Sequence, residues 1–281
     1  MTSPTVRHLL RLTDWSADDV DEVFRLAATF EAGAGPRVDG CAVLFFPPSS
    51  LRTRVSFERG AALMGLQPVT FPPETLDKPE ALADVAAYLA AWADVLVVRH
   101  HDPAVLAGLA APDVLPVVNA MTADDHPCEV LSDLYALSRT ADVRRLRFLF
   151  VGGDGNVARA WQGAAQLLGL DLVQCCPADL RTRDLPPGVR WTDDLADAVT
   201  RADVVLTDAP GEHAAVLAPS QVTADLLARA PEGVRLAPCP PFVRGREVSS
   251  DALASAAFVG HAFKASLLPV QQAVLAHCLT S

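Results

Sequence analysis

The chain has 281 residues, of which 51% are hydrophobic, so it is long enough to build two domains with sizeable cores. Its 34 acidic residues exceed its 23 basic residues by 11, which argues against a nucleic-acid-binding surface. No run of about 18 apolar residues and no signal-like start occurs, and the six cysteines lack Cys-x-x-Cys spacing. We therefore expect a cytoplasmic protein with free thiols and no membrane or nucleic-acid partner.

The first half of the chain alternates predicted helices and strands. A capping-box pattern at Ser16 and Asp19 predicts a helix to about residue 30. Apolar runs predict buried strands at residues 41–46, 68–71, 95–98 and 115–118. Helical spacing predicts helices at residues 52–64, 80–93 and 130–138, with Trp92 facing the core. This alternation indicates a parallel sheet whose ligand lies beyond the carboxyl ends of the strands.

The strongest local signal is the helix start that follows residues 41–46. Two prolines and two serines break the strand, the helix begins within Ser50-Leu51-Arg52-Thr53-Arg54, and Gly65 ends it. Free backbone N–H groups, a positive dipole end, two hydroxyls and two guanidinium groups converge there. That combination predicts a site for a phosphate dianion rather than an ordinary solvated helix start.

This start resembles the Ser-Thr-Arg-Thr-Arg carbamoyl phosphate signature of the aspartate and ornithine carbamoyltransferase family, with Leu51 replacing the first threonine. Residues 119–129, NAMTADDHPCE, extend the resemblance, because the family has Asn-x-x-Thr and then His-Pro-x-Gln there. His126 matches, and Glu129 replaces the glutamine. The alternative of a metal cluster at residues 124–126 is disfavoured, because adjacent side chains cannot all face one ion. We expect no metal and no cofactor.

The second half repeats the alternation. Strands are predicted at residues 146–151, 171–176, 204–206 and 234–237, with helices from the turn at residues 152–158 to 168 and at 268–279. We predict two doubly wound parallel-sheet α/β domains joined by interdomain helices. Residues 1–140, completed by the C-terminal helix 265–281, would bind carbamoyl phosphate, and residues 141–264 would bind the amine acceptor.

The glycine-rich turn at residues 152–158 carries a competing signal. Gly153-x-Gly155-x-x-Ala158 after a strand satisfies the dinucleotide fingerprint of nicotinamide-dependent oxidoreductases. The next strand lacks the acidic residue that this fingerprint requires at its end, because it finishes in Cys175-Cys176-Pro177. The turn also resembles the family's Gly-Asp-Gly-Asn-Asn-Val-Ala segment. Asn156 stands where aspartate carbamoyltransferases often have arginine, which favours the ornithine branch.

Three further segments carry the resemblance with departures. Thr207-Asp208 resembles the Thr-Asp-x-Trp of ornithine enzymes, but the loop that follows is shorter and lacks Ser-Met-Gly. Cys239 is retained from a His-Cys-Leu-Pro motif whose histidine is lost. The Asn-Arg before the last helix is replaced by Ser266-Leu267, and Lys264 is a candidate substitute.

The resemblance implies a set of roles. Catalysis falls to Arg52, Arg99 and His126. Carbamoyl phosphate is bound by Ser50, Leu51, Arg52, Thr53, Arg99, His126, Glu129 and Cys239. The acceptor is bound by Asn156, Asp208 and Cys239. Glu129 adds a negative charge beside a dianion, so we expect Arg159 or Lys78 to neutralise it, or the substrate to differ. Lys78 also resembles a mobile-loop lysine that serves the neighbouring subunit, which implies a homotrimer.

We therefore predict a carbamoyltransferase of amino acid metabolism that moves the carbamoyl group from carbamoyl phosphate to an ornithine-like amine, as in citrulline formation. Two alternatives within the family are an aspartate carbamoyltransferase and a non-catalytic or altered-substrate paralogue. The third alternative is the nicotinamide-dependent oxidoreductase.

Overall fold

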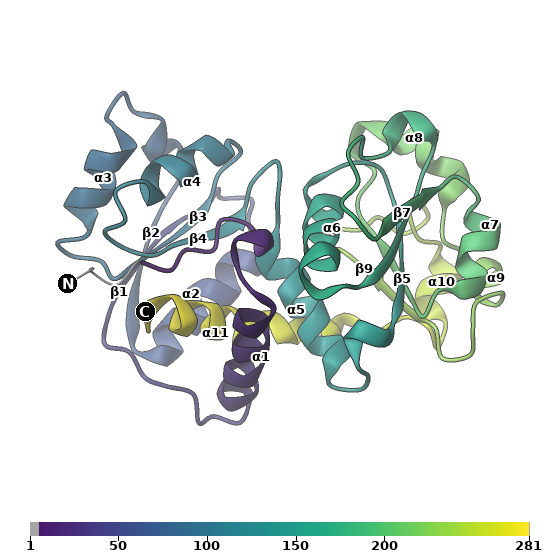
Figure 1. Ribbon diagram of the computed structural model, residues 1–281, viewed down its shortest axis with the longest axis horizontal. Coiled ribbons are helices and arrows are strands. Elements are labelled where there is room, and N and C mark those ends of the chain that lie inside the picture. Colours follow the sequence, from purple (N-terminus) through teal and green to yellow (C-terminus); the bar gives the residue numbers. More distant parts are fainter. Residues whose placement is uncertain (1–5, 281) are drawn as a thin grey trace. The chain divides into compact units, whose positions relative to one another are not determined.

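The computed structural model describes residues 6–280, which divide into two compact units. Unit 1 comprises the described parts of residues 1–135 and 265–281, and unit 2 comprises residues 136–264. Each unit is an α/β layer structure around one parallel sheet (Figure 1).

Unit 1 has four parallel strands in the order β2-β1-β3-β4. The strands are β1 Gly40–Phe45, β2 Leu66–Phe71, β3 Val95–Arg99 and β4 Val117–Met121. The helices are α1 Ala17–Glu31, α2 Arg52–Met64, α3 Leu82–Leu89, α4 Pro103–Ala110, α5 Pro127–Ser138, which runs on into unit 2, and α11 Leu267–Leu279. Helix α11 packs against α1 and α2. Helices α3 and α4 pack on each other on the opposite face of the sheet (Figure 1).

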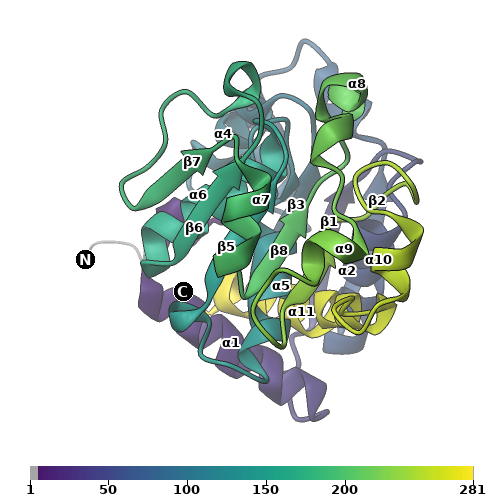
Figure 2. The ribbon, with the colours of Figure 1, turned by 90° about the vertical axis from the view of Figure 1, so that its right-hand side faces the viewer.

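Unit 2 has five parallel strands in the order β7-β6-β5-β8-β9. They are β5 Arg147–Val151, β6 Asp171–Cys175, β7 Val189–Thr192, β8 Val204–Thr207 and β9 Arg235–Pro238. The helices are α6 Asn156–Leu168, α7 Leu195–Ala198, α8 Ala214–Leu217, α9 Ala224–Leu227 and α10 Ser250–Ala254. Figure 2 shows β6, β5 and β8 of this sheet side by side.

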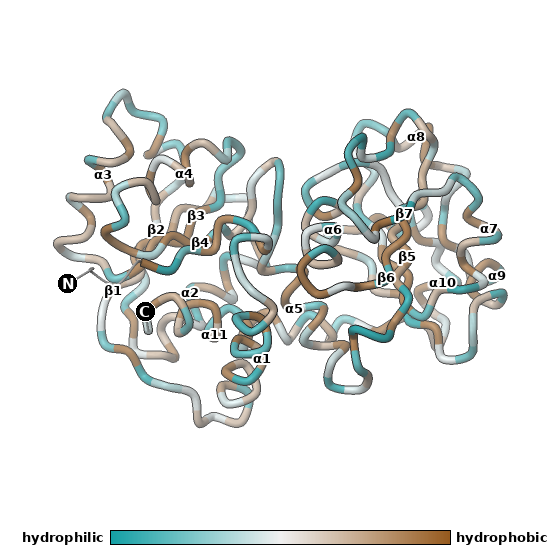
Figure 3. Tube along the Cα trace, viewed as in Figure 1, coloured by the Kyte–Doolittle hydropathy of each residue, from teal (hydrophilic) through white to brown (hydrophobic). Residues whose placement is uncertain are grey.

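The strands form because their residues are apolar without alternation, as expected when helices cover both faces of a parallel sheet. Strands β1, β3, β5 and β8 are buried over most of their length, and Figure 3 shows apolar colouring along β3 and β5. On one face of the unit 2 sheet, Val205 and Leu149 pack with Val199, Val222 and Leu253. On the other face, the Phe148 and Trp161 rings lie 5.3 Å apart.

Helix ends follow the local chemistry that the sequence indicated. Ser16 caps α1 by accepting a hydrogen bond from the Asp19 amide, and Asp19 returns the bond as a capping box. Gly65 ends α2 in the left-handed region at φ 107°, where a side chain would be strained. The predicted order of major elements and the parallel α/β fold are confirmed.

Three expectations about the elements need correction. Helix α3 ends at Leu89, so Trp92 lies beyond it in a turn and is 72% exposed instead of facing the core. Helix α4 was missed, although Asp102 caps it and Pro103 opens it. Strand β7 was missed because it is a four-residue edge strand.

Candidate active site

The candidate site in unit 1 lies where the strand order reverses. Strands β1 and β3 are neighbours, and the chain winds from them in opposite directions to β2 and β4. Ligands in open parallel sheets bind at the carboxyl ends of such strands, at the switch point. The loop after β1 leads into α2, and Arg99 is the last residue of β3.

The first turn of α2 presents its backbone donors without a side-chain cap. Leu51 occupies the N-cap position and makes no capping hydrogen bond, and its side chain is 68% exposed. The first N–H groups of a helix have no intrahelical acceptors, so they remain available to an anion. Ser50 and Thr53 are buried on either side of this turn. The exposed Arg52 side chain forms no ion pair with any residue in 6–280.

Arg99 joins the end of β3 to this turn. Its Nη1 donates a hydrogen bond to Ser50 Oγ at 3.1 Å. Burial and the neighbouring Arg52 lower the pKa of Arg99, while Glu129 raises it. Arg52 and Glu129 therefore both lie within electrostatic reach of Arg99, and Arg99 joins Arg52 at the anion-binding turn.

Arg54 does not join this cluster, contrary to the expectation of two guanidinium groups at the helix start. Its Nε donates to Glu58 Oε1 at 2.8 Å, and the same oxygen accepts from Thr70 Oγ1 at 2.7 Å. The i,i+4 spacing of Arg54 and Glu58 explains this pairing along the helix. The second cation of the site is instead Arg99.

His126 and Glu129 enter the same site from the start of α5. Both are buried, and His126 Nε2 lies 4.0 Å from Glu129 Oε2. Glu129 thus has His126 beside it and Arg99 within electrostatic reach. The sequence suggested Arg159 or Lys78 as its neutralising partner, which stays a prediction, and it did not name Arg99 as a nearby cation.

Asp125 is a buried acid directly before His126. Its backbone N–H donates to Thr122 Oγ1 at 3.1 Å, while its Oδ1 has no hydrogen-bond partner among the described residues. Burial raises the pKa of Asp125 to about 7. The residue is therefore a titrating group next to the site at neutral pH.

Lys78 follows the short 3₁₀ helix Pro73–Asp77 and is exposed. Asp77 Oδ1 lies 3.0 Å from His100 Nε2, which ties this loop to the residue after β3. The loop base is thus fixed near the site edge while Lys78 projects to the surface. No group of three metal-ligating side chains occurs among residues 6–280.

Unit 2 has a corresponding switch point between β5 and β8. The glycine-rich turn follows β5, and the loop after β6 closes over it. The Asp154 amide donates to the Leu180 carbonyl at 2.7 Å, and a Cβ on Gly153 would meet that carbonyl at 3.3 Å. The Asp154 amide is thus unavailable to a pyrophosphate, which weighs against a dinucleotide site.

Arg159 belongs to this turn through a bidentate pair with Asp154. Its Nε and Nη2 donate to the two carboxylate oxygens at 2.9 and 2.7 Å. Thr182 Oγ1 also donates to Asp154 Oδ1 at 3.0 Å. These bonds lower the pKa of Asp154 against the opposing effect of burial. Arg159 therefore pairs within unit 2 with Asp154.

The three predicted acceptor residues gather at the carboxyl edge of the unit 2 sheet. Asp208 follows β8, Cys239 follows β9, and Asn156 opens α6 after β5. Asp208 Oδ1 accepts from the Ala209 amide at 2.8 Å. The Cys239 amide donates to the Thr207 carbonyl at 2.9 Å, and Cys239 is buried. The structure thus brings these residues to one edge, as parallel strands require.

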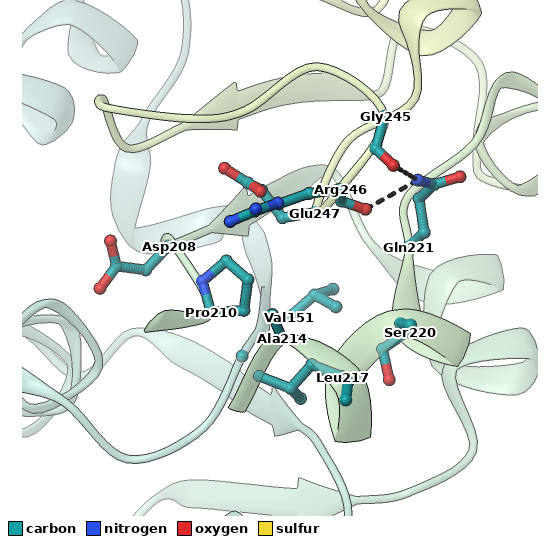
Figure 4. Close-up of a pocket in the computed structure, with 13 residues that line it drawn as sticks. Val151, Asp208, Pro210, Ala214, Leu217, Ser220, Gln221, Gly245, Arg246 and Glu247 are labelled. Atoms are coloured by element: carbon teal, nitrogen blue, oxygen red, sulfur yellow. Dashed lines mark hydrogen bonds between the residues drawn. The ribbon is translucent and has the colours of Figure 1, made fainter. Parts of the chain in front are cut away.

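A cavity of about 320 Å³ opens at this edge, beside Asp208 (Figure 4). Gly152 and Val151 line it from β5, and the segments around α8 and residues 245–247 complete it. Arg246 and Glu247 are lining residues that sequence reasoning missed. The run Val243-Arg-Gly-Arg-Glu247 has the sequence of a solvated loop, and only the fold of unit 2 brings it to the cavity.

Family models match almost the whole chain. Residues 7–139 match the model described as aspartate/ornithine carbamoyltransferase, carbamoyl-P binding domain, and residues 144–278 match the Asp/Orn binding domain. The chain belongs to the aspartate/ornithine carbamoyltransferase family. The predicted family is therefore confirmed, and the chain is a carbamoyltransferase.

Individual relatives agree with this assignment. The chain is 31% identical to an ornithine carbamoyltransferase of Chromobacterium violaceum over 90% of each chain. It is 30% identical to one of Methanopyrus kandleri over 97% of each chain. The solved ornithine carbamoyltransferase of Pyrococcus furiosus matches with a TM-score of 0.89 and 26% identity over 98% of each chain.

Proposed function

We propose that this carbamoyltransferase moves the carbamoyl group from carbamoyl phosphate to an amine of an ornithine-like amino acid and releases phosphate. The observation that carries the proposal is the bond from Arg99 to Ser50 at the uncapped start of α2. It gathers a helix N-terminus, a hydroxyl and two guanidinium groups at the carboxyl edge of a parallel sheet. The names of the relatives support the reaction class.

The phosphate clamp consists of the α2 start. Arg52, Thr53, Ser50 and the backbone at Leu51 bind the phosphate oxygens, since charge-assisted bonds and helix N–H groups both favour a dianion. Arg99 and His126 face the carbonyl oxygen, where negative charge grows as the amine attacks. Glu129 accepts from the carbamoyl NH2, and the nearby Arg99 offsets its charge.

The reaction step requires a neutral amine. Its nitrogen lone pair forms the new C–N bond at the carbonyl carbon, the bond from that carbon to the phosphate oxygen breaks, and the departing phosphate takes the proton from the nitrogen. No covalent enzyme intermediate is involved. The clamp holds the reactants in position, so most of the acceleration comes from orientation and electrostatic stabilisation.

The acceptor is held by Asp208, Asn156 and Cys239. Asp208 pairs with a substrate ammonium, because a carboxylate at the end of β8 is half-buried beside the cavity. We assign Cys239 a second role as well, in binding carbamoyl phosphate. Asn156 is neutral where an aspartate acceptor would call for a cation, which favours an ornithine-like acceptor over aspartate.

We further assign carbamoyl phosphate binding to residues 1–140 with 265–281, and acceptor binding to residues 141–264. The six cysteines are free thiols, which suits the reducing cytoplasm.

We also propose a homotrimer in which Lys78 contributes to the neighbouring site. Its exposure on a loop with a fixed base supports this role. Mixing Lys78→Gln chains with Arg52→Ala chains after partial denaturation should restore activity in hybrid trimers. Two inactive variants that stay inactive when mixed, in trimers verified by light scattering, would contradict the shared site.

The reaction is tested by phosphate release from carbamoyl phosphate with ornithine, aspartate, putrescine and shorter diamino acids. We expect release accelerated over water with ornithine-like amines, together with a ureido product, and little with aspartate. Bound carbamoyl phosphate without product from any amine would favour a non-catalytic paralogue. If aspartate alone accelerated phosphate release, the acceptor would be aspartate instead of an ornithine-like amine.

A further inference from the structure

We propose that Glu247 and Arg246 form a head-group clamp that selects an α-amino acid as the acceptor. Arg246 would bind the substrate carboxylate, and Glu247, together with Asp208, would bind its α-ammonium. This inference rests on the proposed carbamoyl transfer and assigns specificity roles to two residues of the unit 2 cavity.

The cavity has the size and lining of a small-metabolite site. Its volume of about 320 Å³ lies at the low end for ligand pockets. Leu217, Ala214 and Val151 form an apolar wall that suits an unbranched chain of methylene groups. In Figure 4 the Arg246 side chain extends toward the side of the cavity where Asp208 lies, and the Glu247 carboxylate lies on that side too.

Glu247 is a buried carboxylate with one oxygen unused. Its side chain is 9% exposed, and Oε1 accepts from the Val243 amide at 2.7 Å. Oε2 is buried and has no hydrogen-bond partner among the described residues. A buried charged oxygen without a donor is costly, so a cationic donor reaching it from the cavity would bring a large gain. An ammonium group has three N–H donors and the matching charge.

Arg246 supplies the opposite charge at the same cavity. Its side chain is exposed and forms no ion pair with any described residue. A guanidinium fork binds a carboxylate through two parallel hydrogen bonds. One cationic and two anionic side chains on a single cavity thus match the zwitterionic end of an amino acid, with a second amine left to react.

The loop that carries both residues is braced by its own hydrogen bonds. Gln221 Nε2 donates to the carbonyls of Gly245 and Arg246, both at 2.7 Å, and the Gly245 amide donates to the Val248 carbonyl at 2.8 Å. The clamp is therefore preorganised, which reduces the entropic cost of binding.

The test is isothermal titration with three amines that differ in one charge each, in the presence of inorganic phosphate. Ornithine carries both head-group charges, putrescine lacks the carboxylate, and 5-aminopentanoate lacks the α-ammonium. The variants are Glu247→Gln, which keeps an oxygen for the Val243 amide, and Arg246→Gln on the exposed side chain. Arg244→Gln, an exposed neighbour that does not line the cavity, is the matched control.

We expect Glu247→Gln to weaken the binding of ornithine and of putrescine about tenfold, as loss of one ion pair predicts. The dissociation constant of 5-aminopentanoate should stay within about twofold of the wild-type value. Arg246→Gln should weaken the binding of ornithine and of 5-aminopentanoate about tenfold and leave the affinity for putrescine unchanged. Equal shifts for all three amines, no shift in either variant, or no amine binding to the wild type would overturn the clamp. Selective binding without phosphate release would instead uphold the clamp and overturn the proposed reaction.

Discussion

The two switch points of this protein have the same backbone plan and different charged side chains. At the β1/β3 point, an uncapped helix start and two arginines make a cationic site. At the β5/β8 point, the glycine-rich turn is closed by Leu180, and the adjacent cavity carries Asp208 and Glu247. One topology therefore places two arginines at the carboxyl edge in unit 1, and two carboxylates with one arginine, Arg246, in unit 2. The difference depends on a few side chains at the strand ends.

The largest expected effect comes from removing one of the two arginines of the unit 1 site. Arg52→Ala should lower kcat/KM for phosphate release about 10²–10³-fold, because a preorganised charge facing the phosphate is lost. Stopped assays of phosphate release with ornithine measure this effect. Arg59→Ala, an exposed arginine on the same helix, is the control and should retain activity. Equal losses in both variants would show a general charge effect instead of a clamp.

Glu129→Gln tests the negative charge of Glu129 in the cationic site. The substitution keeps the shape and removes a charge near the bound dianion, so carbamoyl phosphate should bind about tenfold more tightly. Titration calorimetry at fixed ionic strength gives the change in Kd. Weaker binding would mean that Glu129 chiefly orients Arg99 or His126, which lies 4.0 Å away.

Ser50→Ala tests whether the bond from Ser50 to Arg99 aligns the site. Loss of one hydrogen bond to a charged group should lower kcat/KM about tenfold. Ser49→Ala, at the exposed neighbouring position, should change little. A Ser50→Ala enzyme with full activity would show that Arg99 is positioned by other contacts.

Asp125 gives unit 1 a pH-dependent stability. Its folded pKa of about 7 lies above the ordinary value of 3.8 for an aspartate, so its contribution to stability is fully present below about pH 4 and is lost as the pH rises to about 7. Asp125→Asn should flatten the fall in unfolding free energy over this window, by at most about 1.4 kcal/mol per pH unit. Urea unfolding between pH 4.5 and 8 measures this. If the unfolding free energies of the wild type and Asp125→Asn changed in parallel with pH, the raised pKa assigned to Asp125 would be refuted.

Much of the fold was readable from sequence because the relevant signals are local. Strands buried on both faces are continuous apolar runs, and Ser16 and Gly65 mark helix ends through capping chemistry. Trp92 was misplaced because its spacing continues a helical pattern that the chain abandons after Leu89. Propensity patterns do not show where a helix ends without a clear cap.

The sites were only partly readable for a related reason. The α2 start was visible because its groups are adjacent in sequence, whereas the contact of Arg99 with Ser50 joins residues 49 positions apart. Arg54 looked equivalent to Arg52 until its pairing with Glu58 was seen. Glu247 gave no signal, because burial of its carboxylate depends on Val243 and on the fold of unit 2.

The most direct test of the central claim is calorimetric titration of carbamoyl phosphate into the wild-type protein and into Arg52→Ala. We predict saturable binding by the wild type and at least a hundredfold weaker binding by the variant, with the folded state of both verified by circular dichroism. Absence of binding to the wild type, or equal affinity in the two proteins, would contradict the assignment of the phosphate site to the start of α2.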